Sequence, residues 1–417
     1  MSSTLADLEI ATFAIDEVVE GAQTGRDGRT LQVSIPQLAV GAGEPALAEA
    51  TVEVVRPGDP VRISNALDAV VPDVRADDPD ATFPGVLGSA DGVVGGRVHR
   101  LAGVAVVPLC DWVGAGYQGA DGLPDSLIDM DGPAADRSPW GATTNVVVRC
   151  VPAPGVPVVE ADAAVRRVAL RVARDLAATT IGGEPDDVVS YADLPSVERD
   201  LPAVVAILQL ASEGPLTDTF ERGRPLRDLR PKVLDPRELL AGALTNGAYD
   251  WPGVRNVTAV YQDGALLRAL FAGHETRLRF AGLILAPGYL DGADQKREAA
   301  DRAAALAAQL GAAAAILTTF SSGNSHTDTM LTVRACERAG VRTAALVCET
   351  NGGLTDHVPE ADCLVSTGNE DELVPAWTPA RVIGGPDRAR IGRPVPMVHY
   401  LGACVQTGDA RWTAVPA

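Results

Sequence analysis

The chain has 417 residues, of which 46% are hydrophobic and only 4% aromatic, so it can bury a sizeable core packed from small side chains. Its formal net charge of −20 argues against binding to nucleic acids or anionic membranes, because their phosphates would repel it. The sequence contains no membrane-spanning apolar stretch, no signal-peptide pattern and no CxxC pair among its cysteines. We therefore expect a cytoplasmic protein of two or three domains.

Residues 1–155 are predicted to form a β-rich N-terminal domain. Runs of alternating or β-branched residues recur there between Gly, Pro and Asp breakers, at Leu8–Val19, Thr30–Ile35, Ala50–Val55, Val98–Leu109 and Val146–Val151. The segment Gly114–Gly119 (GAGYQG) matches the GxGxxG pattern of dinucleotide sites, but loop residues follow it where such a site requires a helix. A glycine-rich turn is the simpler interpretation.

Residues 156–372 are predicted to form an α/β domain. An amphipathic helix is expected over Glu160–Ala178, and from Ala203 onward apolar strands alternate with helices. That alternation is typical of a mostly parallel sheet covered by helices, so the fold class is α/β. Residues 373–417 form a Pro-rich C-terminal tail that we expect to pack on this domain.

A βαβ unit is predicted over residues 311–353. Its two strands are followed by polar loops, Thr319–Asp328 and Glu349–Gly353, and a helix is expected over Thr329–Ala339. Open α/β sheets bind ligands at the carboxyl ends of their strands, which is where both loops lie. The best pocket candidates are therefore Gly323, Asn324, His326, Asp328 and Glu349.

Each candidate also has a structural interpretation. Asp328 could contact a substrate or partner, or could cap the helix that follows it. His326 could be an acid or base at neutral pH, or an exposed loop imidazole. Glu349 could hold an amine or act as a base, or could form hydrogen bonds within its loop. The remaining histidines are scattered without HExxH spacing, so no metal site is predicted.

Seven stretches, in order along nearly the whole chain, resemble one family. They look like the proprotein subunit of component B of glycine/sarcosine/betaine reductase, and in second place like that of D-proline reductase. The matching stretches are Val61–Val71, Phe83–Gly88, Leu127–Pro133, Leu208–Thr219, Gly242–Gly247, Gly323–Asp328 and Thr367–Asn369. Within them, Asn324 and Asp328 fit the family's GN-x-x-x-D loop.

The resemblance implies a reaction. Such subunits cut themselves at an internal cysteine, which becomes a pyruvoyl group that captures the substrate amine as an iminium. A selenocysteine or cysteine on a partner subunit then attacks, and the C–N bond breaks reductively because the cationic imine is an electron sink. The resemblance thus implies a heteromeric complex, with a second component B-like subunit and a small amine or amino-acid-like substrate.

This chain departs from the family at the cleavage region. Ala248–Thr258 (AYDWPGVRNVT), which follows the stretch matching Gly242–Gly247, has no cysteine, and no serine or cysteine occurs between Ser212 and Ser321. Serine or cysteine gives a pyruvoyl group, whereas threonine would give a 2-oxobutyryl group. We therefore predict an uncleaved chain with no pyruvoyl group and no other cofactor.

The altered cleavage loop supplies further candidates. Asn246, Tyr249 and Asp250 are expected to line the pocket if it survives, and Tyr249 and Asp250 could replace the electrophile with hydrogen-bonding groups. The alternative is a surface turn around Trp251–Gly253. Two other functions stay open: a non-catalytic scaffold that stabilises a redox-active partner, and an acid–base enzyme repurposed for a specialised biosynthetic pathway.

Overall fold

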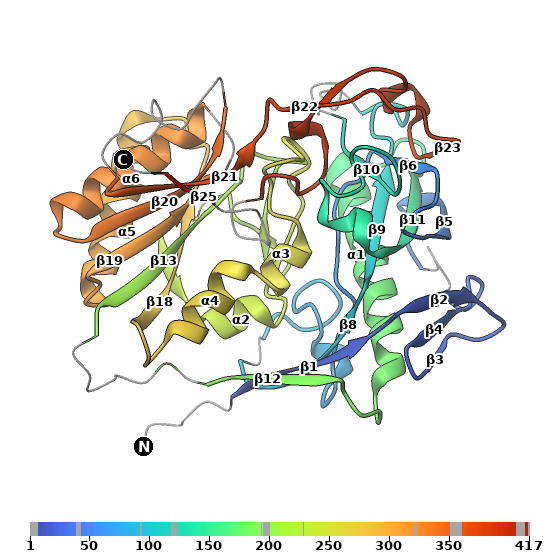
Figure 1. Cartoon of the computed structure of the whole chain (residues 1–417), viewed down its shortest axis with the longest axis horizontal. Helices are drawn as coiled ribbons and strands as arrows, with labels where there is room; N and C mark the ends of the chain where they lie inside the picture. Colours follow the sequence, from blue (N-terminus) through green and yellow to red (C-terminus); the bar gives the residue numbers. More distant parts are fainter. Residues whose placement is uncertain are drawn as a thin grey trace.

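The computed structural model confirms the α/β class. It describes residues 7–38, 43–91, 94–117, 123, 125–192, 194, 201–227, 229–320, 323–350, 361–405 and 413–415. Two halves lie side by side: one is built around a helix-covered sheet, and the other from several smaller sheets and one long helix (Figure 1).

A seven-stranded sheet organises the first half. Its central strands run parallel, and the outer strands β16 and β25 are antiparallel to their neighbours. In sheet order the strands are β16 (Lys232–Leu234), β18 (Arg279–Pro287), β13 (Ala203–Leu210), β19 (Ala314–Thr318), β20 (Arg342–Glu349), β21 (Cys363–Asn369) and β25 (Thr413–Val415).

Both faces of this sheet are covered, and strand β13 is buried along its whole length. Val204 and Leu208 of β13 pack in the cluster formed with short helices, and Val205 and Ile207 pack in the cluster on the other face. The helices of the first cluster are α2 (Pro236–Leu240), α3 (Thr258–Gln262) and α4 (Ala265–Gly273). Those of the second are α5 (Ala293–Gln309) and α6 (Asn324–Arg338).

Smaller sheets form the second half. One has the order β12 (Asp187–Tyr191), β1 (Leu8–Ala14), β8 (Gly96–Ala102) and β7 (Asp73–Arg75). Another joins β5 (Leu47–Val55), β11 (Thr144–Pro152) and β9 (Val104–Cys110). A third joins β10 (Leu127–Asp129), β6 (Val61–Ser64) and β23 (Arg381–Ile383), and a fourth β2 (Glu17–Glu20), β4 (Thr30–Val33) and β3 (Gly25–Asp27).

Short elements complete the chain. The remaining strands are β14 (Phe220–Glu221), β15 (Arg224–Pro225), β17 (Leu244–Thr245), β22 (Leu373–Val374) and β24 (Val395–Pro396). Single turns of 3₁₀-helix occur at Pro79–Ala81, Pro139–Ala142, Ala178–Thr180, Pro386–Arg388 and Met397–His399. Within the described part of the chain, every helix is too short or too polar to cross a membrane.

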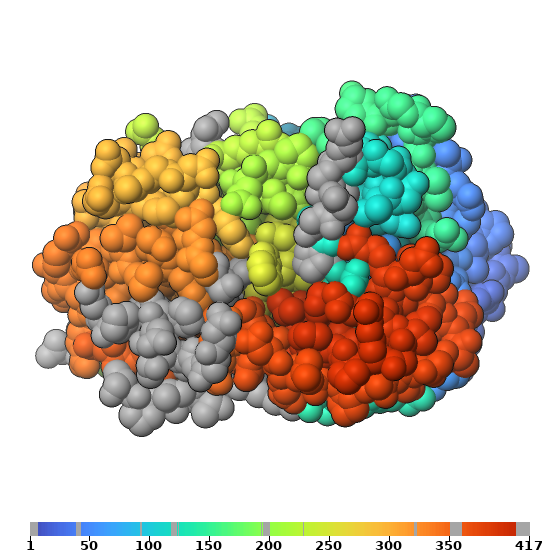
Figure 2. All heavy atoms as spheres, turned by 90° about the horizontal axis from the view of Figure 1, so that it is seen from above, coloured from blue at the N-terminus to red at the C-terminus, as the bar shows by residue number. Residues whose placement is uncertain are grey.

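Helix α1 (Val158–Ala177) packs with the N-terminal strands, although the sequence placed it in the α/β region. Its apolar side chains, such as Val165 and Val172, join the cluster that contains strands β1, β9 and β11. The C-terminal segment also crosses over, since β23 pairs in parallel with β6. Figure 2 shows these red residues lying against the blue and cyan residues of the N-terminal half. Long-range pairing of this kind leaves no local signal in the sequence.

The predicted loop before α6 is wrong in part. The helix begins at Asn324, five residues earlier than the predicted start at Thr329, and Gly323 is its N-cap with φ 69°. That positive φ suits glycine, which lacks the Cβ that makes the conformation costly. Asp328 therefore lies inside the helix and does not cap it. Of the GxGxxG motif, Gln118 and Gly119 lie outside the described residues, while Gly114, Ala115 and Gly116 lie in turns.

Candidate functional site

The carboxyl edge of the seven-stranded sheet is held together by Gln209, the penultimate residue of β13. Its side-chain Nε2 donates to the carbonyl of Ser325 over 2.9 Å, and its Oε1 accepts from the backbone N–H of Phe320 over 2.6 Å. The side chain is buried, and both its donor and its acceptor are used. Gln209 therefore fixes the first turn of α6 against the end of β13.

Asp328 forms a buried ion pair with Lys296 of the neighbouring helix α5. The Lys296 Nζ lies 2.7 Å from Asp328 Oδ1, and the backbone N–H of Leu290 donates to Oδ2 over 3.3 Å. Burial raises the pKa of Asp328, and the ammonium of Lys296 opposes that shift. The pair links α5 to α6 directly behind the strand ends.

Asn324 and His326 lie on the same first turns of α6 but differ in exposure. The exposed Asn324 donates from Nδ2 to the carbonyl of Leu290 over 3.4 Å. His326 is only 3% exposed. The alternative of an exposed loop imidazole is therefore wrong, because the residue belongs to a helix face that packs inward.

Glu349 lies at a different strand end from the other candidates. It closes β20, where its Oε1 accepts from Ser366 Oγ of β21 over 2.5 Å. Strand β20 is separated from β13 by β19 in the sheet. Of the loop predicted after it, residues 351–353 lie outside the described residues.

The altered cleavage loop is closed by a buried hydrogen-bond network with Asp68. The Thr258 hydroxyl donates to Asp68 Oδ2 over 2.5 Å, and the Thr258 N–H donates to Oδ1 over 2.8 Å. The same hydroxyl accepts from the Asn246 N–H over 2.9 Å, and Asn246 Nδ2 donates to the Leu67 carbonyl over 3.3 Å. Burial raises the pKa of Asp68 to about 6. Both ends of the loop are thus fastened to the N-terminal half.

Tyr249 is buried in the middle of this loop. Its hydroxyl donates to Asp162 of α1, and its ring stacks on Trp112 with centroids 6.3 Å apart. Burial raises the pKa of Tyr249 well above its ordinary value, so the phenol stays protonated. The surface-turn alternative holds only for the side chain of Trp251, which is 39% exposed.

Arg255 and Asp250 form the most unusual part of the loop. Arg255 is fully buried, and its NH2 donates to the Ala66 carbonyl over 2.8 Å and to Ser126 Oγ over 3.3 Å. Burial lowers the pKa of Arg255 to about 10 and raises that of Asp250 to about 6, although each charge favours the other. The Oδ1 atom of Asp250 is buried and finds no hydrogen-bond partner among the described residues.

The altered loop packs against the carboxyl edge of the sheet through a small apolar cluster. Ala248 of the loop packs with Ala211 after β13 and Phe320 after β19, and Tyr289 covers this cluster. Charges meet there as well. The pKa of Glu213 rises to about 7 through burial and then through repulsion by Asp250 and Asp291, while Lys296 opposes the shift. The arrangement offers carboxyl groups that can exchange protons near neutral pH.

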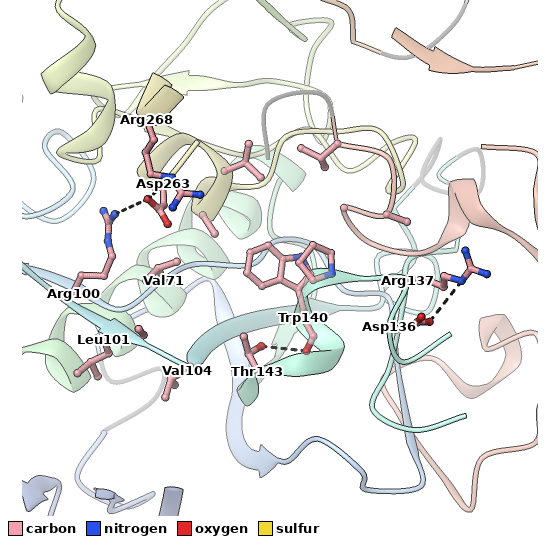
Figure 3. A pocket seen from close by; sticks show the side chains of 18 of the residues that line it. Val71, Arg100, Leu101, Val104, Asp136, Arg137, Trp140, Thr143, Asp263 and Arg268 are labelled. Atoms are coloured by element: carbon pink, nitrogen blue, oxygen red, sulfur yellow. Dashed lines mark hydrogen bonds and ion pairs between the residues drawn. The ribbon is translucent and has the colours of Figure 1, made fainter. Parts of the chain in front are cut away.

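A large cleft lies elsewhere. About 830 Å³ in volume, it is lined by Arg100, Trp140 and Arg268, among other residues (Figure 3). None of the eight predicted site residues lines it, although the family-like stretch Thr367–Asn369 does. The eight predicted residues therefore lie in the altered loop and at strand ends of the sheet, and they do not line this cleft.

Sequence reasoning missed several residues of the site. Asp68 and Gln209 lie inside stretches that resemble the family, so that resemblance was a usable signal for them. Asp162, Lys296 and Arg255 carry no local signal, because their roles depend on partners distant in the sequence.

The comparison with known families places the chain among the subunits of a multi-component reductase. The description "glycine/sarcosine/betaine reductase component B subunits" belongs to the family that matches residues 6–392, and this chain is a member of that family. The match spans both halves of the structure and confirms the resemblance found in the sequence.

Three curated relatives agree with this assignment. A sarcosine reductase complex component B subunit alpha of Peptoclostridium acidaminophilum is 30% identical over 391 residues, which is 90% of this chain and 89% of the relative. Glycine reductase complex component B subunits alpha and beta of Acetoanaerobium sticklandii are 28% identical over 90% of this chain and 88% of the relative. A betaine reductase complex component B subunit alpha of P. acidaminophilum is also 28% identical, over 88% and 85%. No solved structure matches the chain.

Proposed function

We propose that this chain works uncleaved, without a pyruvoyl group, as a subunit of a glycine/sarcosine/betaine reductase-like complex. Its substrate is a small amine or amino-acid-like molecule, and the reaction is reductive cleavage of a C–N or related bond. The observation that carries the proposal is the cleavage region: Ala248–Thr258 contains neither cysteine nor serine, although the family match extends over residues 6–392.

The residues present do not fit a pyruvoyl group. Such a group forms from a side-chain nucleophile that is eliminated from its own Cα, and only serine or cysteine yields it. Thr258 is the one residue with an aliphatic hydroxyl in Ala248–Thr258, and this hydroxyl donates a hydrogen bond to Asp68. We therefore route no step of the reaction through that group.

The buried polar groups of the loop supply the chemistry instead. The orphan oxygen of Asp250 suits a substrate ammonium, and a carboxyl with a pKa of about 6 can take up or release its proton near neutral pH. Glu213, with a pKa raised to about 7, can act likewise. Asp328 and Lys296 neutralise each other and position α6, while Glu349, Asn324 and Gly323 are proposed to line the outer part of the site.

The proposed partner is a second component B-like subunit with a redox-active selenocysteine or cysteine. The partner would supply the attacking selenol or thiol. Five of the six cysteines of this chain are buried, and burial disfavours the reactive thiolate. Affinity purification of the tagged chain from its source cells, followed by mass spectrometry, tests this proposal. Recovery of a stoichiometric reductase-type subunit supports it, and recovery of the chain alone contradicts it.

A second candidate is an acid–base enzyme that performs no reduction. The observation that favours it is the group of carboxyls with pKa values raised to between about 6 and 7, namely Asp68, Asp250 and Glu213. A reconstituted reaction distinguishes the two candidate functions. Turnover that requires the partner's thiol or selenol supports the reductase, whereas turnover by this chain alone supports the acid–base enzyme.

A further inference from the structure

A small cavity of about 20 Å³ lies between the N-terminal half and the altered cleavage loop. Its lining combines the ends of β6 and β9 with the loop, and includes Asn65, Trp112, Ser126 and Tyr249. Arg255 borders it, because its NH2 is hydrogen-bonded to Ser126 and its guanidinium lies 5.8 Å from the Tyr249 ring centroid. The exposed Asp111 contributes to the lining, so the cavity is not sealed.

Three side chains around this cavity carry buried N–H groups that lack acceptors. The atoms are Trp112 Nε1, Asn65 Nδ2, and both Nε and NH1 of Arg255; none has a hydrogen-bond partner among the described residues. The three residues are 3%, 8% and 0% exposed. Tryptophan and arginine can only donate, so these groups call for an acceptor. Leaving several buried donors unpaired in one place is costly and uncommon in native proteins.

The backbone around Asn65 is built to present its amide. Asn65 has a φ of 57°, in the left-handed region that costs a side-chain-bearing residue energy. A Cβ on Gly385 would come within 2.3 Å of Asn65 Nδ2, so only glycine leaves room for the amide there. Strain and a glycine kept for space are both typical of a binding position.

The buried cation beside the cavity has no close anion. Arg255 is fully buried and forms no ion pair among the described residues, although the carboxylates of Asp68 and Asp250 act on it from farther away. Asp111 of the lining already accepts from the Gly114 N–H over 3.0 Å. Arg388, a second cation on the lining, is already paired with Asp125 over 2.8 Å. A water molecule would use only two lone pairs and would need acceptors for its own hydrogens, whereas a carboxylate accepts from several donors at once.

We propose that this cavity binds the carboxylate of a small organic molecule, with Trp112, Asn65 and Arg255 as its donors. The space admits one or two oxygen atoms, which suits a planar carboxylate better than a tetrahedral sulfate or phosphate. The unpaired oxygen of Asp250, on the same loop, suits a cationic group of the same ligand. The inference concerns binding to the chain alone and does not depend on the reductase reaction.

The test titrates the full-length chain with sodium acetate at constant ionic strength set by chloride, following thermal unfolding and ligand-observed NMR. Sulfate and methylammonium chloride are titrated in parallel. Acetate should bind saturably, and Trp112→Phe, which removes one N–H and keeps an aromatic ring, should weaken it about tenfold or more. The matched control is Trp140→Phe, because Trp140 also carries a buried, unpartnered Nε1 but lines the large cleft. This control should bind acetate like the unmodified chain.

Other outcomes would overturn the proposal. The first three are an absence of saturable acetate binding, binding of sulfate as tight as that of acetate, and tighter binding of methylammonium. The fourth is an equal loss of acetate affinity in the Trp112→Phe and Trp140→Phe variants. Should Trp112→Phe fail to fold, Asn65→Gly serves in its place, since glycine tolerates the φ of 57°. That variant should also weaken acetate binding, and unchanged affinity would contradict the assignment.

Discussion

The altered cleavage loop and the start of α6 meet at the same sheet edge, but they are built in different ways. The loop, residues 245–258, depends on partners almost two hundred positions away, such as Asp68, or close to ninety, such as Asp162. The start of α6 is held by Gln209 and by Lys296 of the preceding helix, both within the α/β half. The loop therefore joins the two halves of the molecule, whereas α6 belongs to one.

This difference suggests which region has changed its task. In the altered loop, Nε and NH1 of Arg255 and Oδ1 of Asp250 are buried and have no hydrogen-bond partner in the described part of the chain. At the start of α6, Asp328 and Lys296 satisfy each other within a regular helix pair. Unsatisfied buried groups are more typical of binding sites than of framework. We infer that the loop carries the ligand chemistry and that α6 supports it.

The largest expected effect comes from removing Asp68, the carboxylate that holds the altered loop from outside it. Asp68→Ala takes away the acceptor for the N–H groups of Thr258 and Ala69 and for the Thr258 hydroxyl. The free energy of unfolding should fall by about 4 kcal/mol, because these buried donors are left unpaired. Urea denaturation measures the change. The exposed ion-pair variant Asp301→Ala, as control, should shift it by no more than about 0.5 kcal/mol.

A somewhat smaller effect is expected at α6. Lys296→Met breaks the buried pair and leaves the Asp328 carboxylate without its cation, which should cost about 3 kcal/mol of unfolding free energy. Adding Asp328→Leu should restore most of that loss, since an apolar pair can replace a buried ion pair. A double variant no more stable than Lys296→Met would show that Asp328 has interactions beyond the pair.

A pH-dependent effect is expected from Asp250. Its folded pKa of about 6 exceeds the ordinary value of 3.8, so the folded state binds more protons between those values. The stability contribution of this carboxyl therefore falls as pH rises from about 4 to 7. The free energy of unfolding of Asp250→Asn should rise by about 2 kcal/mol over that range relative to that of the unmodified chain. Urea denaturation at each pH measures this difference. A difference that does not change with pH would place Asp250 in contact with solvent.

The smallest effect tests the contact of the loop with α1. Tyr249→Phe removes the hydrogen bond to Asp162, which keeps its ion pair with Arg166, so we expect a loss of about 1 to 2 kcal/mol. Asn324→Ala, which removes only an exposed 3.4 Å hydrogen bond at the start of α6, should cost less than about 0.5 kcal/mol. Equal losses in thermal unfolding would contradict the contrast between the two regions.

The sequence was sufficient for the parts of the fold that depend on local pattern. The parallel strands at Ala203–Leu210 and Arg342–Glu349 follow from apolar runs between breakers, and the α/β class follows from their alternation with helices. The start of α6 was misplaced because Asn324–Asp328 is polar. A polar run of this kind predicts a loop. In the structure Gly323 supplies the turn before the helix, and tertiary contacts hold the polar residues in its first turns.

The candidate site was only partly predictable for the same reason. Asn246, Tyr249 and Asp250 could be singled out because they fall in or next to the altered segment. The sequence could not show that Tyr249 is hydrogen-bonded to α1 or that Asn246 is hydrogen-bonded to Leu67. Arg255 went unnoticed because an arginine among polar loop residues is ordinarily exposed. Only the folded chain shows it fully buried, with no carboxylate in ion-pair distance among the residues that the structure describes.

The intact mass of the purified protein tests the central claim most directly. The account predicts one species of about 43.2 kDa that does not react with a hydrazide probe for ketones. Two fragments that meet between residues 245 and 258, or a hydrazone on either one, would contradict it and would show that this chain makes its own carbonyl electrophile.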